Sequence, residues 1–269
     1  MDWLPFCRVL AEDVGAVLDD LPTRLEREPV VGAGEGGDET TAIDAASERA
    51  VVARLEELRG TGVKFSLVSE ELGERSFGAA TPLLVLDPID GSMNAKRGVP
   101  FFSISLAVAD GPTMADVFFG YVFDFGTKEE WVARRGEGAF LDGRPLSGPG
   151  PKEEVEILSF EATLTESVAK QVGAMVGFAP RTRVMGSLAL TLCHLAAGRV
   201  DAVCSLKPAR SVDIAAAQLL VRERGLAIDV PDAPPFAAAP LDLTPHSRVV
   251  AAATVARCQE LYARLSASR

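Results

Sequence analysis

The stretch Leu83 to Asn94, LLVLDPIDGSMN, carries the strongest structural and chemical signal in the chain. Its first four residues are apolar, which predicts a strand that is buried on both faces. Asp87 follows at the end of that strand, and Asp90 comes three residues later, directly before Gly91. We therefore expect two carboxylates to be held close together on a tight turn, where they could bind a hard cation such as Mg²⁺.

The Asp-Gly pair in this stretch has a simpler interpretation, because Asp-Gly also favours the turn of a β-hairpin. We assign that simpler role to Asp142-Gly143. An EF-hand calcium loop is excluded, since counting from Asp87 places Gly98 at the twelfth position, where a bidentate Glu is required. A helix that begins near Ser92 would add free backbone N–H groups beside the two carboxylates.

Two further acidic sites lie elsewhere in the chain. Glu70 and Glu71 follow a predicted strand at 64–69, and Asp213 lies in the first turn of a predicted helix of small residues, SVDIAAAQLL. Taken singly, adjacent acids are typical of a solvated loop, and an acid at a helix start is favoured by the helix dipole. Together with the Asp87 motif they predict one shared metal centre.

The periodicity of apolar residues predicts two halves that are built differently and meet near residue 150. The first half, residues 1–148, is expected to be α+β, with an antiparallel sheet and the first metal motifs. Its predicted elements are helices at 3–24 and 45–59, strands at 64–69, 83–86, 102–109, 115–123 and 130–134, and a mobile Gly-rich loop at 32–37.

The second half, residues 149–269, is expected to be α/β and to supply the third metal motif and the substrate pocket. Its predicted elements are a strand at 155–160, helices at 166–176, 187–197, 212–224 and 254–266, and a surface loop at 233–240.

Composition limits the possible partners. The net charge of −11 disfavours binding to nucleic acid. No apolar stretch approaches the roughly 18 residues of a membrane span, and the first residues lack a signal-peptide pattern, so we expect a cytoplasmic protein with no membrane contact. The four cysteines are scattered without a C-x-x-C pair, which favours reduced core thiols over a zinc or disulfide framework.

The acidic motifs resemble, in the same order, the three signature motifs of the inositol monophosphatase family. The matching segments are Glu70-Glu71, Asp87-Pro88-Ile89-Asp90-Gly91-Ser92 and Asp213-Ile214-Ala215-Ala216, with further similarity at 41–44, 136–139 and 186–189. The resemblance implies the layered αβαβα sandwich of the sugar phosphatase fold, usually found as a homodimer.

The resemblance also implies roles for individual residues. Glu70, Asp87 and the carbonyl of Ile89 would hold one Mg²⁺, and Asp87, Asp90 and Asp213 a second, within a site that takes two or three ions. Glu70 and Ser92 would orient the attacking water, with Thr41 and Asp44 supporting them. Water activated in this way would attack phosphorus in line, without a covalent enzyme intermediate.

Substrate choice is less strongly indicated. The segment from Cys204 to Arg210 lacks the Glu with which animal-type members grip inositol, and the 87–102 region is more similar to the archaeal-type fructose-1,6-bisphosphatase/inositol monophosphatase branch. We therefore expect hydrolysis of both inositol 1-phosphate and fructose 1,6-bisphosphate. The predicted substrate-binding residues are Asp90, Gly91, Ser92, Arg183, Ser187, Ser205, Lys207 and Arg210.

Two alternatives stay open at this point. The first is a phosphatase for 3′-phosphoadenosine phosphate or histidinol phosphate, which would share the metal motifs. The second is a homologue that has lost catalysis and binds a protein or RNA partner. The complete set of acidic motifs favours an enzyme over this second alternative.

Overall fold

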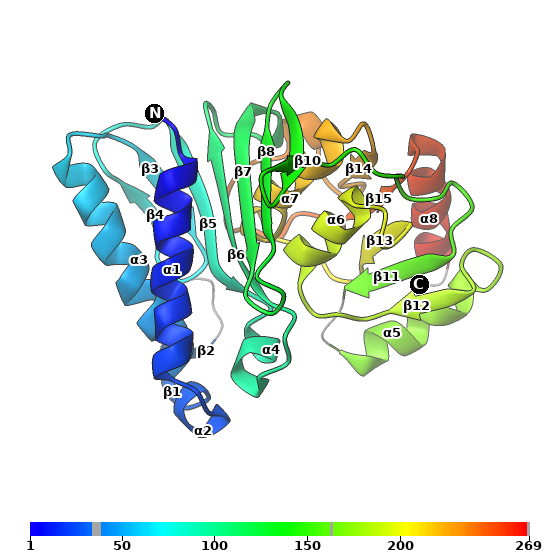
Figure 1. Ribbon diagram of the computed structural model, residues 1–269. Coiled ribbons are helices and arrows are strands. Elements are labelled where there is room, and N and C mark those ends of the chain that lie inside the picture. Colours follow the sequence, from blue (N-terminus) through cyan, green and yellow to red (C-terminus); the bar gives the residue numbers. More distant parts are fainter. Residues whose placement is uncertain (34–38, 162–163, 268–269) are drawn as a thin grey trace.

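The computed structural model describes residues 1–33, 39–161 and 164–267. Helices and sheets alternate in five layers, seen from left to right in Figure 1. The outer helices α1 and α3 cover one face of a large sheet, α6 and α7 lie between this sheet and a smaller one, and α5 and α8 lie on the far side. The predicted αβαβα sandwich is therefore confirmed.

The large sheet has eight strands in the order β10-β9-β8-β7-β6-β5-β3-β4. Its strands are β3 (Ser66–Ser69), β4 (Gly73–Ser76), β5 (Leu83–Asp90), β6 (Ser103–Ala109), β7 (Val117–Asp124), β8 (Glu130–Arg134), β9 (Gly138–Leu141) and β10 (Arg144–Pro145). The antiparallel prediction was wrong for one pair, because β3 and β5 run parallel. The strand β4 forms a hairpin with β3 and lies at the edge of the sheet. The chain then crosses back, and β5 pairs with the other side of β3.

The outer helical layer contains α1 (Leu4–Asp20) and α3 (Ala42–Gly60), which pack against each other. Their buried side chains, such as Leu10 and Leu55, join Leu84 and Leu106 of the sheet in one apolar cluster. Three smaller elements complete this end of the molecule: α2 (Arg24–Arg27), β1 (Val30–Ala33) and β2 (Glu39–Thr41). The predicted mobile loop at 32–37 falls mostly on residues 34–38, outside the described ranges.

The central layer contains α6 (Leu188–Ala196) and α7 (Ser211–Glu223). Nearly every residue of both helices is buried, as expected for helices that lie between two sheets. A Cβ added to Gly120 of β7 would lie 2.5 Å from the carbonyl oxygen of Ala216, so α7 approaches the large sheet as closely as backbone allows. This close packing fixes the start of α7, where Asp213 lies.

The small sheet has five strands in the order β12-β11-β13-β15-β14. They are β11 (Ile157–Glu161), β12 (Arg181–Arg183), β13 (Ala202–Ser205), β14 (Ala227–Asp229) and β15 (Val250–Ala252). The first three run parallel, which agrees with the predicted α/β character, and β15 pairs antiparallel with β13 and β14. The remaining elements are α4 (Ser92–Arg97), α5 (Thr165–Val172), α8 (Val255–Ala267) and the 3₁₀ turns at Met114–Asp116, Gly173–Met175 and Phe236–Ala238.

The two sheets share an apolar core. A single cluster of buried side chains contains Val85 and Val122 of the large sheet, Leu190 of α6 and Val203 of the small sheet. The Asp142-Gly143 hairpin is confirmed, with positive φ angles of 50° and 71° at its two turn residues. The division near residue 150 stays a prediction, and the shared core shows that each half buries part of its apolar surface against the other.

Candidate metal centre

The predicted ligands Asp87 and Asp90 both belong to β5, which extends four residues beyond the expected end at Leu86. Asp87 lies opposite Ser105 and Asp90 opposite Ser103, with a register shift between the two pairs. Such a bulge lets two residues with odd spacing point to the same face of a sheet. The local structure therefore brings both carboxylates to the face that α6 and α7 cover.

Glu70 and Asp213 reach the same place from two other elements. Glu70 directly follows β3, and because β3 is parallel to β5 the carboxyl ends of both strands meet. Asp213 lies in the first turn of α7 and accepts a hydrogen bond of 2.8 Å from the backbone N–H of Arg210. One carboxylate oxygen each from Glu70, Asp87 and Asp213 lies within 4.8 Å of the other two.

Asp90 is held by the start of α6. Its Oδ2 accepts hydrogen bonds from the hydroxyl of Ser187 and, at 2.9 Å, from the backbone N–H of Ala189. Ser187 also caps α6, because its Oγ accepts the N–H of Leu190. The predicted ligand is thus fixed by the N-terminus of a helix from the second half of the chain.

The electrostatics of the cluster favour a bound cation. Burial raises the pKa of Asp87 well above its usual range, and the negative charges of Glu70, Asp90 and Asp213 act in the same direction. Burial likewise raises the pKa of Asp90 to about 8, against the hydrogen bond from Ser187. Carboxylates this close repel one another when all are ionised, and a divalent cation would relieve that repulsion. Their oxygen atoms are also the hard ligands that Mg²⁺ prefers.

Arg210 supplies one positive charge to this cluster. Its Nη2 lies 2.6 Å from Glu70 Oε1 and 3.6 Å from Asp213 Oδ1. This residue was predicted to contact a substrate phosphate, whereas the structure places its guanidinium among the predicted metal ligands. Its role toward substrate stays a prediction.

The residues predicted to support the attacking water lie at the start of α3. The carboxylate of Asp44 accepts hydrogen bonds from the hydroxyl and the backbone N–H of Thr41, which forms a capping box. Lys96 of α4 pairs with the same carboxylate at 3.2 Å. Nearby, burial and the charges of Asp44 and Glu70 raise the pKa of Glu71 to about 7.

The turn into α4 has the predicted shape. Gly91 has a φ of 89°, and a Cβ there would lie 3.1 Å from the carbonyl oxygens of Gly186 and Phe101, so any other residue would be strained. Ser92 is the half-buried first residue of α4. The N–H of Ile89 donates to Asp87 at 2.9 Å, while the ligand role of its carbonyl stays a prediction.

The other predicted substrate-binding residues are spread more widely. The hydroxyl of Ser205 donates to the carbonyl of Lys207 and accepts the N–H of Val249, which gives it a structural role. Lys207 itself is exposed. Arg183 is also exposed, and it lines a pocket of about 150 Å³ beside α6 rather than the carboxylate cluster.

Three residues near the site were missed as individual candidates: Asn94, Lys96 and Glu161. Asn94 donates from one amide nitrogen to the carbonyls of Phe101 and Met185, and so ties α4 to the second half. Glu161 is a buried acid at the end of β11. An acid after an apolar strand was the signal that singled out Glu70 and Asp87, and it would have found Glu161 too.

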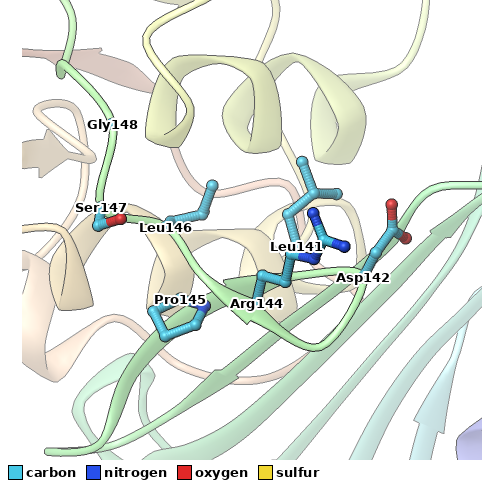
Figure 2. Close-up of a pocket in the computed structure, with 7 residues that line it drawn as sticks. All are labelled: Leu141, Asp142, Arg144, Pro145, Leu146, Ser147 and Gly148. Atoms are coloured by element: carbon cyan, nitrogen blue, oxygen red, sulfur yellow. The ribbon is translucent and has the colours of Figure 1, made fainter.

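Two other features lie apart from the predicted ligand set. A pocket of about 470 Å³ is lined by the β9–β10 hairpin and by residues 146–148 (Figure 2), and none of the predicted ligands lines it. Asp124, Glu129 and His194 also lie close together, but Asp124 accepts from Gly126 and Thr127 and Glu129 pairs with Arg199 at 2.5 Å. Within the described ranges, no helix is long and apolar enough to cross a bilayer.

Comparison with known families decides the assignment. Residues 7–268 match the model of the inositol monophosphatase family. The chain belongs to this family. It is therefore a phosphoric monoester hydrolase.

Relatives of this family member agree with the archaeal-type resemblance. The fructose-1,6-bisphosphatase/inositol-1-monophosphatase of Methanothermobacter thermautotrophicus is 32% identical over 80% of each chain. A crystal structure of an inositol monophosphatase-fructose 1,6 bisphosphatase superposes with a TM-score of 0.83 at 26% identity, covering 98% of this chain and 100% of the other. A bifunctional NADP phosphatase/NAD kinase of Methanococcus maripaludis is 26% identical over 84% of this chain and 43% of its own.

Proposed function

We propose that this phosphatase hydrolyses small sugar and polyol phosphate monoesters in a Mg²⁺-dependent reaction, with inositol 1-phosphate and fructose 1,6-bisphosphate as substrates. The observation that carries the proposal is the cluster of buried Asp87 with half-buried Glu70 and Asp213, and with buried Asp90 on the same strand as Asp87. Membership of the family and the names of the archaeal relatives support the substrate class.

The carboxylates of Glu70, Asp87, Asp90 and Asp213, with the carbonyl of Ile89, would hold two or three Mg²⁺ ions. When bound, Mg²⁺ would neutralise phosphate oxygens and lower the pKa of water toward neutrality. The protein contributes rigidity, because each carboxylate lies at a strand end or a helix start. The guanidinium of Arg210 must share Glu70 and Asp213 with these ions or move aside.

Glu70 and Ser92 would orient the attacking water, and Glu70 would accept its proton. The capping box of Thr41 and Asp44 fixes the start of α3 beside them, with Lys96 balancing the charge of Asp44. Gly91 lets the turn before α4 pack closely against the carbonyl oxygens of Gly186 and Phe101.

We also propose that the enzyme works in the cytoplasm as a homodimer. Met93, Val99 and Val184 are exposed apolar residues. They flank the contact between Asn94 and the carbonyl of Met185, so they lie in one region of the surface. Light scattering of the purified protein tests this point, and a monomer at all concentrations would contradict it.

The test of the proposed function is phosphate release from five substrates, with Mg²⁺ and with chelator. The panel is inositol 1-phosphate, fructose 1,6-bisphosphate, 3′-phosphoadenosine phosphate, histidinol phosphate and NADP. We expect turnover of the first two that requires Mg²⁺. Turnover confined to the last three would contradict the proposed substrate class, and NADP turnover would agree with the NADP phosphatase relative instead.

A further inference from the structure

Glu161 lies at a position where α/β sheets commonly place functional groups. It is the last residue of β11, and its side chain is 6% exposed. The chain passes from β11 to β12 on one side and then across to β13 on the other, so the carboxyl end of β11 is a topological switch point. Ligand sites form preferentially at such points.

Both carboxylate oxygens of Glu161 bind to groups near the start of α6. Its Oε2 accepts the backbone N–H of Gly186 at 2.9 Å. Its Oε1 accepts the hydroxyls of Thr191 at 2.7 Å and Ser159 at 3.0 Å. Glu161 therefore joins β11 to the turn that precedes α6 and to the first turns of α6 itself.

The same turn is held from the opposite side by Asn94. The amide nitrogen of Asn94 donates to the carbonyl of Met185 at 2.7 Å. Gly186 has a φ of 90°, and a Cβ there would lie 3.0 Å from this nitrogen, so the two segments are in tight contact. Ser187, the next residue, donates to Asp90.

From these contacts we infer that Glu161 is a positioning residue for the metal centre. It fixes the turn at Gly186, so that the hydroxyl of Ser187 and the N–H of Ala189 hold Asp90 in its orientation toward the other carboxylates. Glu161 belongs to the second half of the chain and Asp90 to the first, so this connection crosses between the two sheets. The inference rests on the proposed function, in which Asp90 binds Mg²⁺.

Glu161→Gln tests the inference, because it removes the negative charge and one of the two acceptor oxygens that hold the turn at Gly186 and the start of α6. We expect Mg²⁺ to bind at least about tenfold more weakly, since groups that orient a metal ligand commonly contribute 10- to 100-fold in affinity. The readout is the dissociation constant by calorimetry on chelator-stripped full-length protein, with the shift in Tm on adding Mg²⁺ as a second measure.

The matched control is Asp201→Asn. Asp201 is also 6% exposed, and its two oxygens accept the backbone N–H groups of Lys152, Glu156 and Ile157 at the opposite end of β11. We expect this change to lower Tm but to leave Mg²⁺ affinity within about twofold of wild type. A merely structural role for Glu161 would make the two variants behave alike.

A double-mutant cycle tests whether Glu161 acts through Ser187. In a Ser187→Ala background, Glu161→Gln should lose less Mg²⁺ affinity than it does in wild type, because only the N–H of Ala189 is left to hold Asp90. If Glu161→Gln does not fold, Thr191→Val is measured in its place, because the valine lacks the hydroxyl that donates to Glu161. Thr191→Val should weaken Mg²⁺ binding by at least about twofold.

The outcomes separate this inference from the proposed function. The inference alone is overturned if Mg²⁺ affinity is unchanged in Glu161→Gln, or in Thr191→Val where Glu161→Gln fails to fold. It is also overturned if Asp201→Asn loses as much affinity as Glu161→Gln. A full loss on adding Glu161→Gln to the Ser187→Ala background overturns it as well. Wild-type protein that binds Mg²⁺ without releasing phosphate from any substrate overturns the proposed function alone. Wild-type protein that binds no Mg²⁺ overturns both.

Discussion

Asp87 and Asp90 are buried beside two other carboxylates, and this arrangement opposes folding unless a cation is present. Arg210 is the cation that the structure places among them, through Glu70 and Asp213. One guanidinium cannot balance four ionised carboxylates, so proton uptake or metal binding must supply the remaining positive charge.

This conflict predicts a pH-dependent stability of the metal-free protein. Asp90 has a folded-state pKa of about 8 against an ordinary value of 3.8, so unfolding releases its proton and stability falls as pH rises between these values. Asp90→Asn cannot ionise, and we expect it to raise Tm by at least about 2 °C at pH 8 in chelator. The gain should shrink at pH 5, and a Tm change of equal size at both pH values would contradict the account.

The two arginines proposed for substrate binding should behave differently. Arg183 is exposed and lines a pocket whose lining includes none of the predicted metal ligands, so we expect it to bind a second phosphate. A charge-assisted hydrogen bond contributes roughly 1.5–3 kcal/mol, so Arg183→Ala should raise KM for fructose 1,6-bisphosphate about tenfold and leave inositol 1-phosphate unchanged. Arg210→Ala should impair both substrates, because Arg210 contacts Glu70 and Asp213.

Steady-state kinetics of both variants on both substrates check this prediction. If Arg183→Ala affects the two substrates equally, Arg183 serves the fold or the shared phosphate. If Arg210→Ala affects only the bisphosphate, its guanidinium must leave the carboxylate cluster when substrate binds.

Sequence alone indicated the candidate metal ligands but not the groups that hold them. Glu70, Asp87, Asp90 and Asp213 could be found because acids at strand ends and helix starts leave a local pattern. Glu161 also follows an apolar strand, but its partner Gly186 and the partners of Asn94 and Lys96 lie tens of residues away, and no local pattern indicates those pairings. The distance between Arg183 and the cluster likewise depends on how the two sheets pack.

The helix α7 shows how element packing positions a ligand. Gly120 of β7 lies between Ala107 of β6 and Ala133 of β8, so three adjacent strands present small residues at one level. The backbone of Ala216 fills the space this creates. Asp213, one turn earlier on α7, depends on that approach for its place beside Asp87.

Gly120→Ala should therefore damage both stability and activity. Its Cβ would lie 2.5 Å from the carbonyl oxygen of Ala216, and such overpacking costs about 1–3 kcal/mol. We expect a Tm lowered by several degrees and a reduced turnover rate, measured by calorimetry and phosphate release. Gly60→Ala is the control, because nothing lies within 4 Å of its Cβ position and it should leave both unchanged or slightly raise Tm. A Gly120→Ala enzyme with wild-type Tm and turnover would contradict this account of α7.

Most elements could be predicted from periodicity, and the differences have physical causes. The end of β5 was placed at Leu86 because a strand that contains two acids and a proline breaks the apolar pattern, yet the bulge opposite Ser103 and Ser105 lets pairing continue to Asp90. The parallel pair β3 and β5 depends on which edge β4 takes, a choice that the sequence of β3 does not reveal.

Across the whole molecule, the centre is assembled from both halves. Glu70, Asp87 and Asp90 come from the large sheet, while Asp213 and the groups that hold Asp90 come from α7 and α6. The shared apolar core between the sheets keeps these contributions in register. Metal binding is therefore expected to stabilise the packing of the two sheets against each other, so Mg²⁺ should raise Tm of wild type at pH 8.

The central claim is that these carboxylates form a Mg²⁺-dependent phosphatase site, and one measurement tests it most directly. Phosphate release from inositol 1-phosphate is compared between wild type and Asp90→Asn at saturating Mg²⁺, with wild type in chelator alongside. We expect Asp90→Asn to lose more than about a hundredfold in turnover while it stays folded, and wild type to be inactive in chelator. Near-normal turnover by Asp90→Asn, or full wild-type turnover in chelator, would contradict the claim.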